Sequence, residues 1–364
     1  MNLFEEQRLV DVCSYLRSGK TITASEISTH GEYPVFGGNG CRGYTTHYNF
    51  SGDCAIIGRQ GAFCGNVRYF TGNAYMTEHA IIACANNKNN TRYLSYLLST
   101  MNLGRLSGQS AQPGLSVKYL SNVKIFIPSL NIQKKIVSVL SLLDDKIKLN
   151  NKINDNLAEI LQTLYQQQFC YSKGTGNQGR LADLCDYSKT KVAVAELSLS
   201  TYYSTENMLP GKAGAVDAAS LPTTAQATKC QIGDVLISNI RPYFKKIVYC
   251  HSDCGCSADV LCFTPKVSQL SAYLYSTLYV DSFFDFMVAG SKGTKMPRGD
   301  KQQIMAYVIH IPTEEEIRTF NKLAIPILGQ MESTHRENMR LSSLRDSLLP
   351  KLMSGELDVS ELDI

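Results

Sequence analysis

Polar side chains suited to base recognition follow two apolar stretches of this sequence. Arg59 and Gln60 come directly after residues 52–58, and Arg241 and Tyr243 follow the corresponding stretch of the second half. In duplex DNA, arginine donates two hydrogen bonds to guanine, and glutamine or asparagine exchanges two with adenine. Both places therefore carry the chemistry for reading base edges. The alternative is that they are ordinary solvated loops.

A denser basic loop lies further along the second half. Lys292, Lys295 and Arg298 suit contacts to phosphate, whereas the corresponding loop of the first half, with Gln109, is neutral and polar. Because the two loops differ, they cannot make the same contacts. The remaining candidate DNA-binding residues lie in neighbouring polar turns: Asn39, Arg42, Tyr44, Arg68 and Lys245.

Catalytic motifs are missing from the sequence. There is no G-x-x-x-x-G-K-[ST] phosphate loop, no H-E-x-x-H metal motif, no G-x-S-x-G and no aromatic-ended Asn-Pro-Pro or Asp-Pro-Pro tetrapeptide. Thr77, Glu78 and His79 are more simply a hydrogen-bonded core contact at the start of a strand, and Asp144 and Asp145 are the solvated face of a helix. We expect no catalytic residue, no metal site and no cofactor in this chain.

Two long amphipathic stretches, residues 131–170 and 313–354, must position these loops. Each begins after an Ile-Pro pair, and apolar residues recur at heptad spacing, which predicts coiled-coil helices. The helix-pairing positions are Ile136, Leu143, Asn150, Leu157 and Leu164 in the first stretch and Phe320, Ile327, Thr334, Leu341 and Leu348 in the second. In the first, Val139, Leu140, Ile147, Ile153, Ile160 and Leu161 fill the intervening turns. One constant offset relates the two series, because Leu157 and Leu341 lie as far apart as Pro128 and Pro312, which indicates an internal repeat.

The two helices are predicted to pair antiparallel, since they match in length and in the place of one polar residue. Asn150 is then expected to face Thr334 and to fix the register. Pro326 is expected to break or kink the second helix. The alternative is two separate helices, each covering its own domain.

The fold class is α/β (α+β), with two tandem mixed domains separated by the two helices. The first domain spans residues 1–130 and the second 180–312, with a Gly-rich linker at 171–179 and a tail at 355–364. The domains repeat each other: GDVLISNIRPY corresponds to GDCAIIGRQGA, and AYLYSTLY corresponds to the short helix expected at 92–101.

Composition fits an intracellular protein of two or more domains. The 364 residues are 44% hydrophobic and 19% charged, without a signal peptide or membrane span, so we expect a cytoplasmic protein. The net charge is +4 for residues 1–130 and −4 for residues 313–364. Twelve cysteines lack zinc-finger spacing, and coincidence explains the cluster Cys250, Cys254 and Cys256 better than a metal site with His251.

Taken in order, these segments resemble the specificity subunit of type I restriction-modification systems. The matching pieces are YPVFGGNGCRGY, GRQGAFCGNV with TEHA, SAQPGLS, IPSLNIQKKIVSVL, GDVLISNIRPYFKK, GTKMPRGD and LRDSLLPKLMSGEL. The resemblance implies two target-recognition domains, each reading one half of an asymmetric bipartite DNA site. It also implies that the helices dock two methyltransferase subunits, which recruit restriction subunits, and that the tail packs near residues 1–8.

The resemblance further implies that S-adenosylmethionine, ATP and magnesium belong to partner subunits. A helix of about 38 residues spans roughly 57 Å, enough to hold two domains on successive turns of a duplex. Two alternatives remain: an enzyme that acts on DNA alone, and a coiled-coil adaptor or orphan DNA-binding protein without a working restriction partner.

Overall fold

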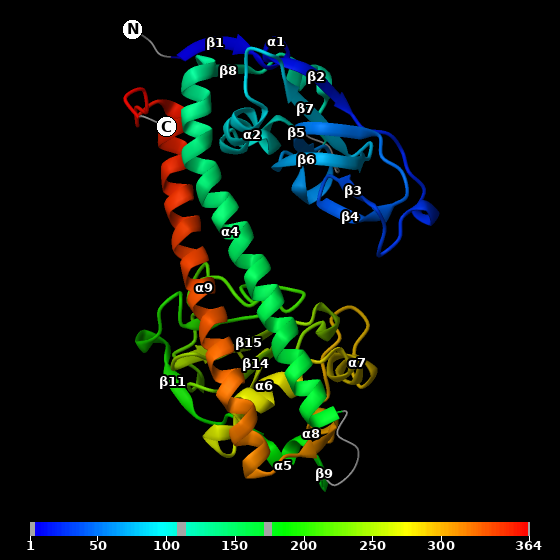
Figure 1. Cartoon of the computed structure of the whole chain (residues 1–364), viewed down its shortest axis with the longest axis vertical. Coiled ribbons are helices and arrows are strands. Elements are labelled where there is room, and N and C mark those ends of the chain that lie inside the picture. The colour runs from blue at the N-terminus through cyan, green and yellow to red at the C-terminus, as the bar shows by residue number, and fades with distance from the viewer. Residues whose placement is uncertain (1–3, 108–113, 171–176, 363–364) are drawn as a thin grey trace. The chain divides into compact units, whose positions relative to one another are not determined.

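The computed structural model describes residues 4–107, 114–170 and 177–362, and it divides into two units. Unit 1 comprises Met1–Ile147 and Arg340–Ile364, and unit 2 comprises Lys148–Met339. Each unit is described by itself below (Figure 1).

Unit 1 contains a six-stranded sheet in the order β2-β7-β5-β6-β3-β4 and a two-stranded ribbon of β1 and β8. The strands are β1 (Phe4–Arg8), β2 (Cys13–Ser18), β3 (Tyr33–Gly37), β4 (Gly40–Thr45), β5 (Phe50–Gly58), β6 (Val67–Met76), β7 (Ala80–Ala85) and β8 (Lys124–Pro128). The end of β5 is buried from Cys54 to Gly58, because it lies between β6 and β7.

The main core of unit 1 forms where α2 (Thr91–Thr100) covers β5 and β7. Tyr93, Leu94 and Leu98 are fully buried there, and each such side chain contributes about 1.5–3 kcal/mol to folding. The side chain of Asn90 caps this helix by accepting a hydrogen bond from the backbone N–H of Tyr93 at 2.9 Å. Two short helices complete the unit, α1 (Leu9–Val12) and α3 (Val117–Ser121).

Unit 2 repeats this plan with smaller sheets. They are ordered β10-β17-β14-β15, β11-β13-β16-β12 and β18-β9. The strands are β9 (Asn177–Arg180), β10 (Cys185–Tyr187), β11 (Lys191–Ala193), β12 (Tyr202–Tyr203), β13 (Gln226–Cys230), β14 (Val235–Ser238), β15 (Ile247–Tyr249), β16 (Cys254–Cys256), β17 (Val260–Pro265) and β18 (Val308–Ile311). The helices are α5 (Leu181–Leu184), α6 (Ser271–Tyr279), α7 (Asp281–Ala289) and α8 (Lys301–Met305).

Two long helices contribute to both units, α4 (Leu130–Tyr165) and α9 (Glu314–Ser354). A capping box starts α9: the backbone N–H of Thr313 donates to Glu316 Oε2 at 2.7 Å, and the backbone N–H of Glu316 donates to Thr313 Oγ1 at 3.3 Å. In Figure 1 the two helices run side by side.

The helices pack antiparallel in both units. In unit 1, Asp144 of α4 bonds Arg345 of α9. In unit 2, Asn150 bonds Asn338 and Asn154 bonds Met331, so residues further along α4 meet earlier residues of α9. Two mixed α/β units with such a helix pair confirm the predicted fold class, and the alternative of two separate helices is wrong.

Three details of the helix prediction are wrong. Asn150 does not bond Thr334: it donates to Asn338 Oδ1 at 2.9 Å, while the Thr334 hydroxyl donates to the carbonyl of Gln330 in its own helix. Pro326 does not break α9, which is a single helix from Glu314 to Ser354.

The third error concerns the apolar stripe of α4. Ile153 and Ile160 are 36% and 50% exposed, so they do not fill the seam between the helices. They share a stripe with Leu149, which is 53% exposed, so the apolar residues of α4 form a second face beside the seam.

The connecting segments also differ from the sequence-based description. Residues 177–179, which we assigned to a linker, belong to β9 and pair with β18, whereas residues 171–176 lie outside the described residues. In unit 1 the ring of Phe4 lies against Gly355. Figure 1 shows β1 and the end of α9 both near the start of α4.

No described helix is long and apolar enough to cross a membrane. Within residues 4–107, 114–170 and 177–362, no group of His, Cys, Asp or Glu side chains could hold a metal ion. Cys250, Cys254 and Cys256 are instead buried members of an apolar cluster.

Candidate nucleic-acid interface

The same backbone loop follows the central strand in both units. We call residues 58–66 and 238–246 the strand-end loops. Each closes on itself: the backbone N–H of Gly58 donates to the carbonyl of Asn66 at 2.8 Å, and that of Ser238 donates to Lys246 at 3.2 Å. Gly58 and Ser238 lie as far apart in the sequence as Asn66 and Lys246, so a single offset relates the two loops.

Each strand-end loop is anchored to a turn before the next strand. The backbone N–H of Arg59 donates to the carbonyl of His79 at 2.9 Å, and that of Asn239 donates to Asp259 at 2.8 Å. The offset that relates the loops also relates these partners. The run Thr77, Glu78 and His79 is thus part of a hydrogen-bonded turn.

A third segment, which we call the closing loop, contacts each strand-end loop. It contains Leu115 in unit 1 and residues 292–299 in unit 2. The backbone N–H of Leu115 donates to Arg59 at 2.8 Å, and that of Gly299 donates to Asn239 at 3.3 Å. Leu115 and Gly299 are separated by the slightly larger offset that relates the long helices. Both candidate sites thus consist of a strand-end loop, a turn and a closing loop.

The two strand-end loops share two left-handed backbone positions but fill them differently. In unit 1 these are Gly61 (φ 78°) and Gly65 (φ 85°), which tolerate positive φ. In unit 2 they are Arg241 (φ 50°) and Lys245 (φ 51°). A side chain in this region costs about 1–2 kcal/mol per residue, so unit 2 bears a cost that unit 1 avoids.

In unit 1, the turn between β3 and β4 lies against the strand-end loop. A Cβ on Gly38 would lie 3.4 Å from the carbonyl oxygen of Gln60, so the two backbones approach closely. Arg68 donates to the carbonyl of Asn39 in that turn at 3.2 Å. The residues of our set that the structure brings together here are Asn39, Arg42, Arg59, Gln60 and Arg68.

In unit 2, the structure brings together all six candidates. Arg241, Tyr243 and Lys245 lie in the strand-end loop, and the backbone N–H of Arg241 donates to the carbonyl of Pro297 in the closing loop. That loop also carries Lys292, Lys295 and Arg298. Lys292 and Arg298 bond each other through both backbone N–H groups at 2.9 Å, which fixes the loop between them.

Carboxylates hold most of these cations in place. Arg298 Nη2 lies 2.9 Å from Asp259 Oδ1, and Lys292 Nζ lies 2.7 Å from Asp300 Oδ2. Lys245 Nζ lies 3.0 Å from Asp281 Oδ1. Hydrogen bonds from Lys212 and then Lys245 lower the pKa of Asp281, and the bond from Lys292 lowers the pKa of Asp300. The carboxylates of Asp281 and Asp300 are therefore ionised at neutral pH.

One described candidate of unit 1, Tyr44, does not join the site. Tyr44 lies toward the far end of β4, where its backbone bonds Ser28. Gln109 lies outside the described residues. Sequence reasoning also missed Phe63, because matching GDVLISNIRPY to GDCAIIGRQGA sets Tyr243 opposite Ala62. The hydrogen bonds of the strand-end loops set Tyr243 opposite Phe63 instead.

All ten predicted helix-pairing residues are buried or partly buried.

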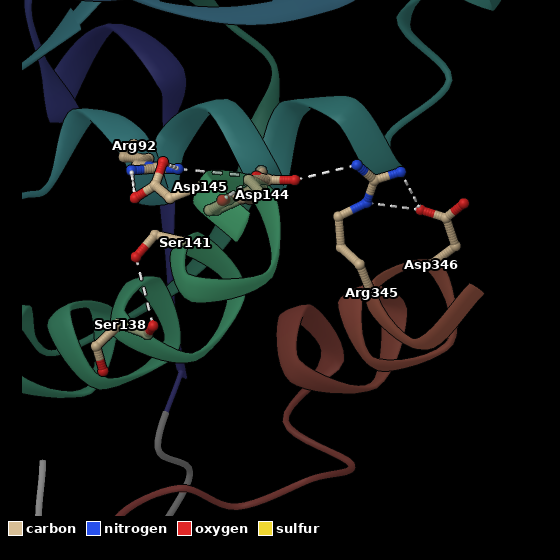
Figure 2. A network of polar contacts seen from close by, with 8 residues as sticks. Arg92, Ser138, Ser141, Asp144, Asp145, Arg345 and Asp346 are labelled. Atoms are coloured by element: carbon tan, nitrogen blue, oxygen red, sulfur yellow. Dashed lines mark hydrogen bonds and ion pairs between the residues drawn. The ribbon is translucent and has the colours of Figure 1, made fainter. Parts of the chain in front are cut away.

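In unit 1 a polar network joins the helices to α2 (Figure 2). Asp144 accepts a hydrogen bond from Arg345 Nη1 at 3.0 Å and another from the hydroxyl of Tyr96, and Arg92 lies 3.0 Å from Asp145. Burial and the bond to Asp144 raise the pKa of Tyr96.

In unit 2 aromatic rings anchor the helices to the domain. The rings of Phe169 and Tyr273 lie 4.7 Å apart, and those of Phe169 and Phe320 lie 5.3 Å apart. Such pairs contribute about 0.5–1.5 kcal/mol beyond their buried area.

Comparisons with known proteins identify this architecture. Residues 1–159 match the family described as the type I restriction modification DNA specificity domain. The chain is 40% identical over 144 residues to the type I restriction enzyme EcoprrI specificity subunit of Escherichia coli. The chain is therefore similar to the specificity subunits of type I restriction enzymes, and residues 1–159 carry the match to the family. The resemblance predicted from the sequence is confirmed.

The coverage of these matches varies. The alignment to the E. coli specificity subunit spans 38% of this chain and 35% of that protein. A type I specificity subunit of Methanocaldococcus jannaschii, MjaIX, is 24% identical over 75% of this chain and 70% of its own length. The S subunit crystal structure from M. genitalium matches 96% of both chains at 15% identity with a TM-score of 0.64, which shows a shared fold.

Proposed function

We propose that this chain is a non-catalytic DNA-targeting subunit of a type I restriction-modification complex. Each unit reads one half of an asymmetric bipartite sequence in double-stranded DNA. The observation that carries the proposal is the three-segment site, present twice with the same backbone but with different side chains. Two half-sites of different sequence require recognition loops that are held in the same way but carry different side chains.

Arg241 is the strongest candidate for reading a base edge. It lies in the strained left-handed region, and its Nε is buried without a hydrogen-bond partner among the described residues. Strain and an unpaired buried donor both cost free energy, which a bond to a ligand offsets. A guanidinium donates two parallel bonds to guanine.

The closing loop of unit 2 suits the phosphate backbone. Lys295 is exposed, and Arg298 is 2.9 Å from the carboxylate of Asp259, which orients its guanidinium. Lysine and arginine contacts to phosphate fix position along the duplex but carry no sequence information. In unit 2, the closing loop therefore positions the DNA, and the neighbouring strand-end loop reads its bases.

The long helices set the spacing between the half-sites in this proposal. With 36 residues, α4 is about 54 Å long, more than one turn of duplex DNA. The helices also dock two methyltransferase subunits. In unit 2, Leu149 and Ile160 of α4 are 53% and 50% exposed, with Ile153 on the same stripe, an apolar surface that suits a partner helix.

Catalysis belongs to the partners in this proposal. The methyltransferase subunits bind S-adenosylmethionine, and the restriction subunits, recruited through them, use ATP and magnesium. This chain contributes the choice of DNA sequence.

The test is methylation mapping in cells that carry this chain with its neighbouring methyltransferase. We expect one asymmetric bipartite sequence to be methylated. Replacing residues 180–312 with the same domain of a relative should change one half-site and leave the other. A change in both halves would contradict independent reading.

A binding experiment separates this function from its alternatives. The purified complex should protect one bipartite sequence in a footprint. Uniform, fully salt-sensitive binding would instead favour an adaptor that reads no sequence. Methylation of DNA by the chain alone, with S-adenosylmethionine added, would make it an enzyme.

A further inference from the structure

An aromatic side chain occupies the same place in both strand-end loops. Phe63 is 40% exposed in unit 1, and Tyr243, its counterpart in the repeat, is 49% exposed in unit 2. Each lies midway between the two left-handed positions of its loop. The repeat thus keeps an exposed ring at a position where the flanking residues have changed from glycine to arginine and lysine.

The loop backbone holds both rings outward. Inside the loops, the N–H of Cys64 donates to the carbonyl of Gly61 at 3.0 Å, and the N–H of Phe244 donates to Arg241 at 2.9 Å. These bonds add to the closure of each loop and leave the backbone little freedom. An apolar ring held in water forgoes the free energy of burial, so a partner that covers it gains that energy.

The surroundings favour nucleic acid over a protein as this partner. Tyr243 lies between Arg241 and Lys245 and beside a closing loop with three more cations. Its ring centroid is 4.8 Å from that of Phe244, so the two form one apolar surface within a basic site. An aromatic ring among cations suits a ligand that has both phosphates and flat bases.

We propose that Phe63 and Tyr243 are matched apolar base contacts, each ring packing on a base of its own half-site. The inference rests on the proposed function and adds residues that act by contact with bases instead of by hydrogen bonds. The base presents either the methyl group of thymine or its flat face to the ring.

The test uses the complex with its methyltransferase subunits and a duplex carrying the mapped site. Phe63→Ala and Tyr243→Ala should each weaken binding to that duplex about tenfold and leave binding to unrelated duplexes unchanged. Tyr243→Phe should retain binding, because it keeps the ring. Phe126→Ala is the matched control, an exposed phenylalanine on β8 of unit 1, and should bind as the parent does.

Salt and site variants sharpen the assignment. The slope of log affinity against log salt reports phosphate contacts and should not change in the alanine variants, whereas Lys295→Ala should lower it by about one unit. Scrambling the half-site read by unit 1 should abolish the effect of Phe63→Ala only. Deoxyuridine in place of thymine identifies the contact: a tenfold loss for the parent complex points to the methyl group, and unchanged binding points to the ring face.

Two failures are distinguishable. If the parent complex shows no sequence preference, the proposed function is wrong and this inference falls with it. If the parent is selective and the Phe63→Ala and Tyr243→Ala variants are equally selective, the inference alone is overturned. An equal loss on mapped and unrelated DNA also overturns it, since a ring on the sugar-phosphate backbone would behave that way.

Discussion

Asn150 of α4 donates a hydrogen bond to the side chain of Asn338 of α9 at 2.9 Å, between the two long helices in unit 2. The exposed fractions of these residues are 1% and 8%. Asn338 in turn donates to Asn151 at 2.8 Å, and Asn150 also reaches Glu337 at 2.7 Å. A buried polar pair of this kind specifies register, because any slip leaves both amides without partners.

Replacing Asn338 with Ala should lower the free energy of unfolding by about 1–3 kcal/mol, since it removes one of the two acceptors of the buried Asn150 amide. Urea unfolding of the purified chain measures this. A double-mutant cycle with Asn150→Ala isolates the pair, and strictly additive losses would show that the two amides do not interact.

Thr334→Val is the matched control on the same face of α9. The Thr334 hydroxyl donates only within its own helix, to the carbonyl of Gln330 at 2.8 Å. Thr334→Val should therefore lower the free energy of unfolding by much less than Asn338→Ala does. An equal decrease for the two variants would mean that the register does not depend on the asparagine pair.

The sequence predicted that Asn150 is a polar register residue, but it could not identify the partner. Thr334 corresponds to Asn150 in the repeat. In the structure, however, the residue that bonds Asn150 is Asn338, one helical turn after Thr334. A repeat relates positions within each helix, whereas the vertical offset of two antiparallel helices depends on how the domains hold their ends. That offset has no signature in the sequence.

In unit 1, Asp144→Asn should destabilise the chain more than Asp145→Asn. Asp144 accepts from both Arg345 and Tyr96 and is mostly shielded, whereas Asp145 is exposed and, among the described residues, bonds only Arg92. We expect a loss of about 1–3 kcal/mol for Asp144→Asn and under about 1 kcal/mol for Asp145→Asn, measured by urea unfolding. The reverse order would contradict the arrangement in Figure 2.

Stability should fall as the solution becomes acidic, in part because of His251. Burial lowers the pKa of His251 below its usual 6.5, the carboxylate of Glu332 opposes that shift, and Arg336 and His335 add to it. Because the folded pKa lies below the unfolded one, this contribution is fully present above about pH 6.5 and is lost as the pH falls.

The melting temperature of His251→Gln should therefore depend less on pH between about 7.5 and 5.5 than that of the parent chain. His30→Gln, on the surface of unit 1, is the control and should follow the parent. If the two variants show the same pH dependence, the buried imidazole is not responsible.

Part of each candidate site could be predicted from the sequence. Residues after the central strands were expected to project polar groups, and Arg59, Gln60, Arg241 and Tyr243 do lie in the strand-end loops. Phe63 was missed because matching the two apolar stretches sets Tyr243 opposite Ala62, the residue before it. Insertions and deletions between the elements change the offset, and only the strand register reveals where.

The glycines of unit 1 should differ in their tolerance of a side chain. A Cβ on Gly61 meets nothing within 4 Å, so Gly61→Ala should cost about 1 kcal/mol for its positive φ alone. A Cβ on Gly65 would lie 2.1 Å from the backbone nitrogen of Gly104, so Gly65→Ala should cost about 2 kcal/mol or more. Urea unfolding compares them, and equal losses would mean that the segment at Gly104 yields readily.

Glycine at the strained positions of unit 2 should separate stability from function. Arg241→Gly and Lys245→Gly relieve a left-handed backbone, so the free energy of unfolding should stay level or rise by up to about 1 kcal/mol. Both should weaken binding to the mapped duplex, Arg241→Gly by about 1–3 kcal/mol.

Asn102→Gly is the control, because Asn102 is also left-handed, at φ 46°, but lies outside the strand-end loop of unit 1. It should gain the same relief and leave DNA binding intact. A structural role for Arg241 predicts lost stability on removal of its side chain, whereas a role in recognition predicts lost affinity alone. Variants that unfold more easily and bind as tightly as the parent would therefore exclude Arg241 from the recognition of DNA.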